Sequence, residues 1–169
     1  HFNNIKYFAN KVDELHVIVS EPSEKSARKT PTGRKITGQI AADVLDVYIK
    51  NLPLSNVTVI VNPQPVKYVY DFLAEQTQPG DTVLLGVGGV GEDAKRFANA
   101  GKYAPKGVKF VISEAPMTAD TSGGKLSATN FRETLGHLTT SNLMPYIPDE
   151  FVGNKHVIQK VYKLLNTLP

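Results

Sequence analysis

TVLLGVGGVGEDAKRF, residues 82–97, places an apolar run directly before a glycine-rich turn and a helical pattern. The run at 82–87 is a continuous row of apolar residues rather than an alternating one, which is typical of a strand covered on both faces. The glycines mark a tight turn, and the helical pattern begins with two acidic residues. This stretch therefore predicts a strand, turn and helix of a parallel α/β fold.

The same order continues on both sides of this stretch. We expect further strands at 14–20, 57–62 and 108–113. We expect helices at 2–11, about 36–51, 66–77, 129–136 and 154–166. Four alternations of helix and strand favour a parallel sheet with crossover helices. The predicted fold is a Rossmann-like three-layer α/β/α architecture with a parallel sheet of four to five strands. No linker or repeat is visible, so we predict a single domain over 1–169, with a helical tail at about 137–169.

Composition narrows the class of protein. A chain of 169 residues with 41% hydrophobic and 21% charged residues is ordinary for a globular domain. No apolar run approaches the roughly 20 residues that a membrane span needs, so we expect no membrane partner. Cysteine is absent, which excludes disulfides and fits a cytoplasmic location. A formal charge of +3 is too small to argue for nucleic acid. No histidines have the spacing of metal ligands, so no metal site is assigned.

The glycine-rich turn resembles a dinucleotide-binding fingerprint. Gly86, Gly88 and Gly91 have G-x-G-x-x-G spacing, and an acidic residue follows the next predicted strand. However, such fingerprints normally open the first βαβ unit, whereas this one follows the third visible strand. The helix also starts with Glu92 and Asp93, which would repel a pyrophosphate. An oxidoreductase that binds NAD is therefore an alternative, and a turn at the carboxyl edge of the sheet is favoured.

A basic loop follows the first predicted strand. Its segment EKSARKTPTGRK, 24–35, has one acidic residue and the five cations Lys25, Arg28, Lys29, Arg34 and Lys35. A solvated loop and a phosphate-facing loop both explain these charges. A nucleic-acid patch is weaker, because no aromatic residues lie between the cations.

The segment GGKLSATNFRE, 123–133, has the residues of a phosphate-binding helix start. Ser127 and Thr129 lie at the first turn of a predicted helix, where N–H groups are free and the dipole end is positive. Arg132 can add a bidentate, charge-assisted contact. Helix capping alone would explain one hydroxyl, but it would not explain Arg132.

LSATNFR resembles the ISSTxxR-type motif of nucleotidylyltransferases that carry an HxGH motif, the cytidylyltransferase-like superfamily. In that family the second His of HxGH is followed by a helix, a strand, a basic loop, a long helix and further βα units up to ISSTxxR. This chain begins HFNNIKYF and has that order, so the resemblance covers about residues 1–136. His1 looks like the second His of the motif.

The resemblance implies that the enzyme transfers a nucleoside monophosphate from CTP or ATP to a phosphate-bearing acceptor and releases pyrophosphate. Mg²⁺ is expected with the nucleoside triphosphate. His1 and Arg132 would act on the reacting phosphates. The other implied contacts are Ser127, Thr129 and either Lys29 or Arg34 to the phosphates, and Gly86, Gly88 and Asp93 beside the base and ribose.

The start of the chain at His1 leads to a further expectation. The family's first motif His and the strand before it are not in this sequence, and Ala128 stands where a Ser or Thr is usual. We therefore expect a fragment that self-associates, has little transferase activity and leaves strand edges at 14–20 and 82–87 to pair with each other or with another chain. A non-catalytic nucleotide-binding module is the remaining alternative.

Overall fold

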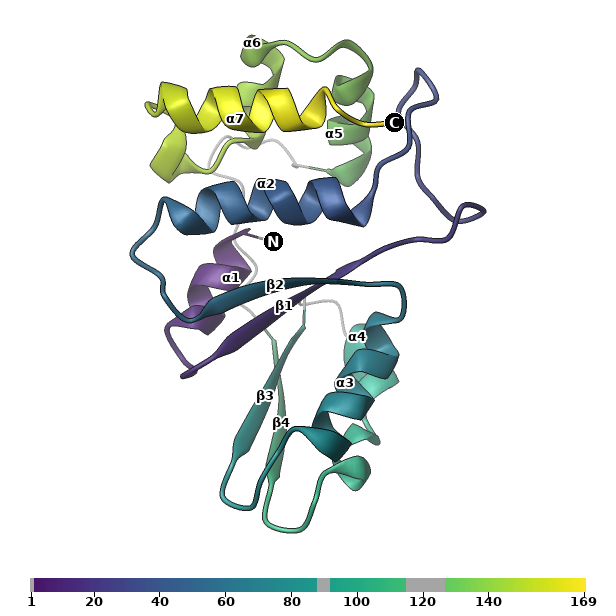
Figure 1. Cartoon of the computed structure of the whole chain (residues 1–169), viewed down its shortest axis with the longest axis vertical. Helices are drawn as coiled ribbons and strands as arrows, with labels where there is room; N and C mark the ends of the chain where they lie inside the picture. Colours follow the sequence, from purple (N-terminus) through teal and green to yellow (C-terminus); the bar gives the residue numbers. More distant parts are fainter. Residues whose placement is uncertain (1, 88–91, 115–126) are drawn as a thin grey trace. The chain divides into compact units, whose positions relative to one another are not determined.

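Figure 1 draws the computed structural model, which describes residues 2–87, 92–114 and 127–169. The longer helices are α1 (Phe2–Ala9), α2 (Gly38–Lys50), α3 (Pro65–Glu75), α4 (Glu92–Phe97), α5 (Ala128–Thr134), α6 (Thr140–Leu143) and α7 (Lys155–Leu165). The strands are β1 (Leu15–Ser20), β2 (Val57–Asn62), β3 (Thr82–Val87) and β4 (Lys109–Glu114). Short 3-10 turns are η1 (Ala100–Tyr103), η2 (Leu135–His137), η3 (Met144–Tyr146) and η4 (Asp149–Phe151).

Contacts within the chain divide it into two compact units. The first unit comprises His1–Leu15 and Gln64–Thr118, and the second comprises His16–Pro63 and Ala119–Pro169. Each unit contains one parallel pair of strands: β3 with β4 in the first, and β1 with β2 in the second. The chain is therefore a mixed α/β protein, and each unit is described by itself.

The first unit packs helices on both faces of a small sheet. β3 and β4 run in parallel from the pair Thr82–Lys109 to the pair Val87–Glu114. Val83 and Leu85 of β3, with two apolar residues of β4, pack against a core cluster of Leu73, Phe97 and Ala100 from the helical layer. The alternate residue Gly86 lies against the Phe8 ring of α1. Because neighbouring strand residues point to opposite faces, α1 and α3 cover opposite sides of the sheet.

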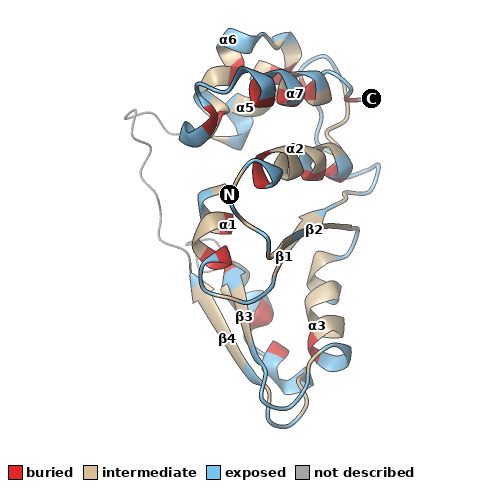
Figure 2. Ribbon diagram, turned by 60° about the vertical axis from the view of Figure 1, so that its left-hand side comes forward, coloured by how far each residue is buried: buried red, intermediate tan, exposed pale blue. Residues whose placement is uncertain are grey.

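The second unit has its core around α2 and α7. α7 buries Val157, Ile158, Val161 and Leu165 at helical spacing, so one face is apolar and the other carries charge. Figure 2 shows the buried residues as bands on α2 and α7, which contact each other. Tyr48 of α2 stacks on Phe151 with ring centroids 5.3 Å apart. Burial raises the pKa of the Tyr48 phenol to about 12.

The start of α2 is held tightly against the end of β1. The Thr37 side chain accepts a hydrogen bond from the Ile40 amide at 3.2 Å and caps the helix. The Glu21 carboxylate accepts another from the Gln39 amide at 3.2 Å. Together they satisfy two of the free amides that every helix start presents.

The predicted elements agree with the structure to within a few residues for all four strands and for the helices before residue 115. The predicted tail at about 137–169 contains α6 and α7, and between them lie the 3-10 turns η3 and η4, which the periodicity did not predict. The ranges that the structure describes form two separate two-stranded sheets, so a sheet of four to five strands is not shown, and neither is direct pairing of β1 with β3. An apolar run predicts that a strand exists, but long-range backbone hydrogen bonds decide its neighbours.

Within the described part of the chain, no helix combines the length and the apolar character needed to cross a membrane.

Candidate functional site

The start of α5 contains three of the predicted site residues. Ser127 is the N-cap, and its hydroxyl accepts a hydrogen bond from the Asn130 amide at 3.0 Å. The capping interpretation is therefore confirmed for this hydroxyl. The Thr129 hydroxyl accepts a hydrogen bond at 3.0 Å from the Arg132 guanidinium, one turn along the helix. A guanidinium has five N–H donors, so this contact orients Arg132 and uses only one of them.

The basic loop contains an ordered β-hairpin. Lys29 and Lys35 form an antiparallel bridge, and the Ile36 amide donates to the Arg28 carbonyl at 2.9 Å. The turn between them is closed by the Thr30 amide, which donates to the Arg34 carbonyl at 2.9 Å. Gly33 adopts φ +83°, a left-handed conformation that glycine tolerates best. We call residues 28–36 the basic hairpin.

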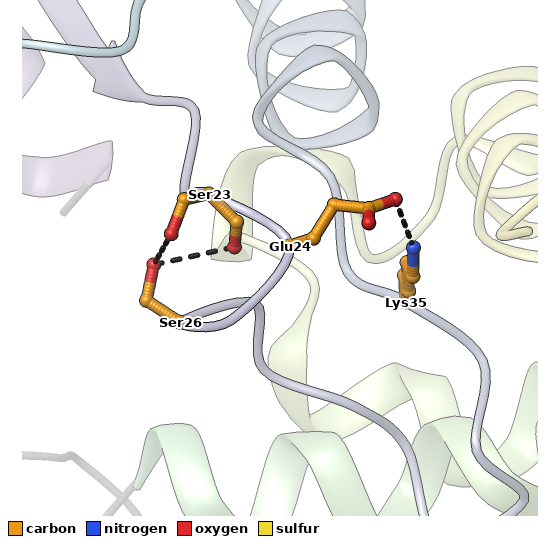
Figure 3. Close-up of polar contacts among 4 residues, drawn as sticks. All are labelled: Ser23, Glu24, Ser26 and Lys35. Atoms are coloured by element: carbon orange, nitrogen blue, oxygen red, sulfur yellow. Dashed lines mark hydrogen bonds and ion pairs between the residues drawn. The ribbon is translucent and has the colours of Figure 1, made fainter.

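Two of the loop cations already have partners in the protein. The Arg34 guanidinium donates to the Leu168 carbonyl at 2.7 Å and also to the Asn166 carbonyl, both just beyond α7. The Lys35 ammonium forms an ion pair with the Glu24 carboxylate at 3.0 Å, as Figure 3 shows. This pair lowers the pKa of Glu24, mainly through the hydrogen bond from Lys35.

The segment before the hairpin is folded on itself as well. The hydroxyls of Ser23 and Ser26 lie 2.8 Å apart, and the Ser26 hydroxyl also donates to the Ser23 carbonyl at 3.2 Å (Figure 3). The three remaining loop cations, Lys25, Arg28 and Lys29, have exposed side chains. Of the two predicted phosphate-binding cations, Lys29 is therefore exposed to solvent, whereas Arg34 contacts the end of α7.

The hairpin and α5 belong to the same compact unit. α5 continues directly into η2, where Gly136 lies against Pro31 at the hairpin turn. A Cβ on Gly136 would lie 3.2 Å from the Pro31 ring. The five predicted site residues Lys29, Arg34, Ser127, Thr129 and Arg132 thus come from one unit, whereas Gly86 and Asp93 come from the other.

The remaining predicted residues are placed only in part. His1 and Gly88 lie outside the described residues, and so does the side chain of Asp93. Gly86 lies in β3, and a Cβ there would be 2.6 Å from the Phe8 ring. The absence of a side chain at Gly86 therefore lets α1 pack on the sheet. This packing gives a structural reason for the first glycine of the G-x-G-x-x-G spacing.

We expect that replacing Gly86 with valine destabilises the protein by about 1–3 kcal/mol, the usual cost of overpacking. Phe8 is 5% exposed, so its ring has little room to move. Urea unfolding followed by circular dichroism measures the loss. Gly101→Ala is the matched control, because its Cβ would meet Phe110 at an ordinary 3.4 Å. Equal midpoints for the two variants would mean that α1 does not need a glycine at 86.

The sequence missed Thr30 as the residue that shapes the hairpin. Its side chain is 4% exposed, and its hydroxyl accepts from the Arg34 amide at 3.1 Å and lies 2.9 Å from the Thr32 hydroxyl. The signal was present in the segment TPTG, 30–33, because Pro and Gly at these positions are typical of a turn.

One shallow depression lies between α2 and α7 and has a volume of about 360 Å³. Its lining residues are Val47, Lys160, Lys163, Leu164 and Thr167, and none of the predicted site residues is among them. Across the described ranges, no group of three or more His, Asp or Glu side chains could hold a metal ion.

Comparisons with protein-family models, with curated proteins and with solved structures found no match for this chain.

Proposed function

We propose that this chain is a nucleotidyltransferase domain that transfers a nucleoside monophosphate from CTP or ATP to a phosphate-bearing small molecule. The observation that carries the proposal is the contact between Thr129 and Arg132 at the start of α5, directly after the Ser127 cap. Capping requires Ser127 alone. A second hydroxyl that orients a guanidinium is an arrangement suited to phosphate oxygens.

The proposed reaction is an in-line displacement. A phosphate oxygen of the acceptor attacks the α-phosphorus, and the bond from the α-phosphorus to the bridging oxygen breaks. Pyrophosphate leaves with that electron pair. The protein supplies position and positive charge rather than a covalent intermediate. Arg132 and Thr129 would bind the β- and γ-phosphates, and Lys29 would add a second cation.

The rest of the proposal follows from the family resemblance. His1 would hydrogen-bond the reacting phosphates, and Gly86, Gly88 and Asp93 would border the nucleoside. Mg²⁺ would arrive with the triphosphate. A Rossmann-like sheet of four to five strands is part of the proposal, and the two parallel strand pairs are the part of it that the structure contains. A cytoplasmic location and self-association belong to the same proposal.

Arg132→Ala tests the site directly. We expect it to weaken CTP or ATP binding by roughly 1.5–3 kcal/mol, the range for a hydrogen bond to a charged group, which is about 10- to 150-fold in Kd. Isothermal titration measures the loss. Arg132→Lys should recover part of the affinity, because lysine keeps the positive charge but lacks the planar pair of N–H donors of a guanidinium. Lys155→Ala removes an exposed charge elsewhere in the same unit and serves as the control.

The other outcomes separate the alternatives. Affinity for both CTP and ATP that survives Arg132→Ala would refute the site. Low-micromolar NAD binding that is lost on Gly88→Val would favour an oxidoreductase. Pyrophosphate release is tested with phosphomonoesters of small alcohols and sugars, in this chain and in one that also carries the family's first strand and first motif His. Nucleotide binding without pyrophosphate release in both would indicate a non-catalytic nucleotide-binding module.

A further inference from the structure

Three hydrogen bonds connect the basic hairpin to the segment that follows α7. The Arg34 guanidinium donates to the carbonyls of Asn166 and Leu168, the second at 2.7 Å. The Lys35 amide donates to the Pro169 carbonyl at 2.7 Å. Residues more than 130 positions apart in sequence are thus held side by side.

The chemistry of a helix end explains why an arginine fits here. The last carbonyls of a helix lack partners within the helix, and this end carries partial negative charge. A guanidinium can donate to these carbonyls and is attracted to this negative charge, because it is a permanent cation with several donors in a fixed plane. Here it reaches the carbonyls of the C-cap Asn166 and of Leu168.

The residues that carry the acceptor carbonyls follow α7, whose apolar face is packed in the core. Val157, Val161 and Leu165 of α7 are at most 7% exposed, and Leu168 is 4% exposed. Their positions are therefore set by packing rather than by the hairpin. On the hairpin side, the backbone of Arg34 closes the turn with Thr30 through bonds of 2.9 and 3.1 Å. One residue thus bonds both the turn and the helix end.

We propose that Arg34 is a positioning residue, which holds the basic hairpin on the end of α7 and so sets where Lys29 lies. The inference rests on the proposed function, because Lys29 is the cation that would meet the triphosphate. Two of the five N–H donors of Arg34 bond backbone carbonyls, and these bonds fix its guanidinium at the end of α7. The Lys29 side chain is exposed at the antiparallel bridge.

The first test does not involve a nucleotide. Hydrogen exchange is measured by NMR on the amides of Thr30, Arg34 and Ile36, which the hairpin hydrogen bonds protect. We expect Arg34→Ala to raise their exchange rates at least about tenfold, because two charge-assisted bonds are lost. Arg28→Ala removes an exposed cation from the same hairpin and should leave the rates unchanged.

The amides of α2 and α7 serve as the internal standard for folding. If the amides of α2 and α7 also lose protection in Arg34→Ala, the milder variant Arg34→Lys is used instead. It should raise the exchange rates of the hairpin amides alone. Hairpin exchange that stays unchanged in both variants would overturn the inference, whatever the chain binds.

The second test is a double-mutant cycle on CTP and ATP binding with Arg34→Ala and Lys29→Ala. If Arg34 acts through Lys29, the double variant should bind about as well as Lys29→Ala alone. If the fold-losses in affinity of the two single variants multiply in the double variant, Arg34 contacts the phosphates directly and the positioning role is refuted. If the unsubstituted chain binds neither nucleotide while hairpin exchange rises as expected, the hairpin contact stands and the proposed function fails.

Discussion

Replacing Gly38 with valine is expected to destabilise the protein by about 3 kcal/mol. A Cβ at this position would lie 2.6 Å from the Ser20 carbonyl oxygen and 2.9 Å from the Glu21 carboxylate. The Ser20 oxygen is backbone at the end of β1 and cannot rotate away. The first turn of α2 would have to shift, which adds overpacking strain to the loss of the cap that Glu21 and Thr37 provide.

Urea unfolding followed by far-ultraviolet circular dichroism measures this loss. The matched control is Gly153→Val, because a Cβ on Gly153 meets nothing within 4 Å and its φ is not in the left-handed range. The control should stay within about 0.5 kcal/mol of the unsubstituted chain. A Gly38→Val variant as stable as the control would show that α2 does not rest on the end of β1.

Replacing Leu73 with alanine is expected to cost about 2–5 kcal/mol in the free energy of unfolding. Leu73 is 0% exposed and lies at the centre of the cluster with Phe97 and Ala100. Removing its branched end leaves a cavity between α3 and η1, which contact each other, and the surrounding side chains can refill it only in part. Val152→Ala is the control, because Val152 is 47% exposed.

Hydrogen exchange on the Leu73→Ala variant also tests the prediction of a single domain. If the chain unfolds as one domain, amides in both compact units should lose protection together. Loss confined to the first unit, His1–Leu15 with Gln64–Thr118, would show that the units unfold separately and would contradict the single-domain prediction. An unchanged midpoint would contradict the cavity argument itself.

Local signals in the sequence determined the secondary structure and part of the candidate site. The strands at 57–62 and 82–87 match their apolar runs because β-branched residues such as the valines in both runs favour extended backbone. The Ser127 cap and the contact between Thr129 and Arg132 each join residues three apart. Interactions within one helical turn depend only on spacing, so the sequence alone can predict them.

Only the tertiary structure decided the partners of Gly38, Gly86 and Arg34. The sequence predicts Arg34 as a phosphate-binding cation, and the structure shows that it also donates to carbonyls 132 and 134 residues further along the chain. Gly38 and Gly86 leave room for the Ser20 carbonyl and the Phe8 ring, respectively, and neither is needed for a turn of its own. A backbone carbonyl is available at every residue, so no pattern in the sequence marks which of them a distant guanidinium will reach. The packing of α7, which brings those carbonyls to the hairpin, makes that choice.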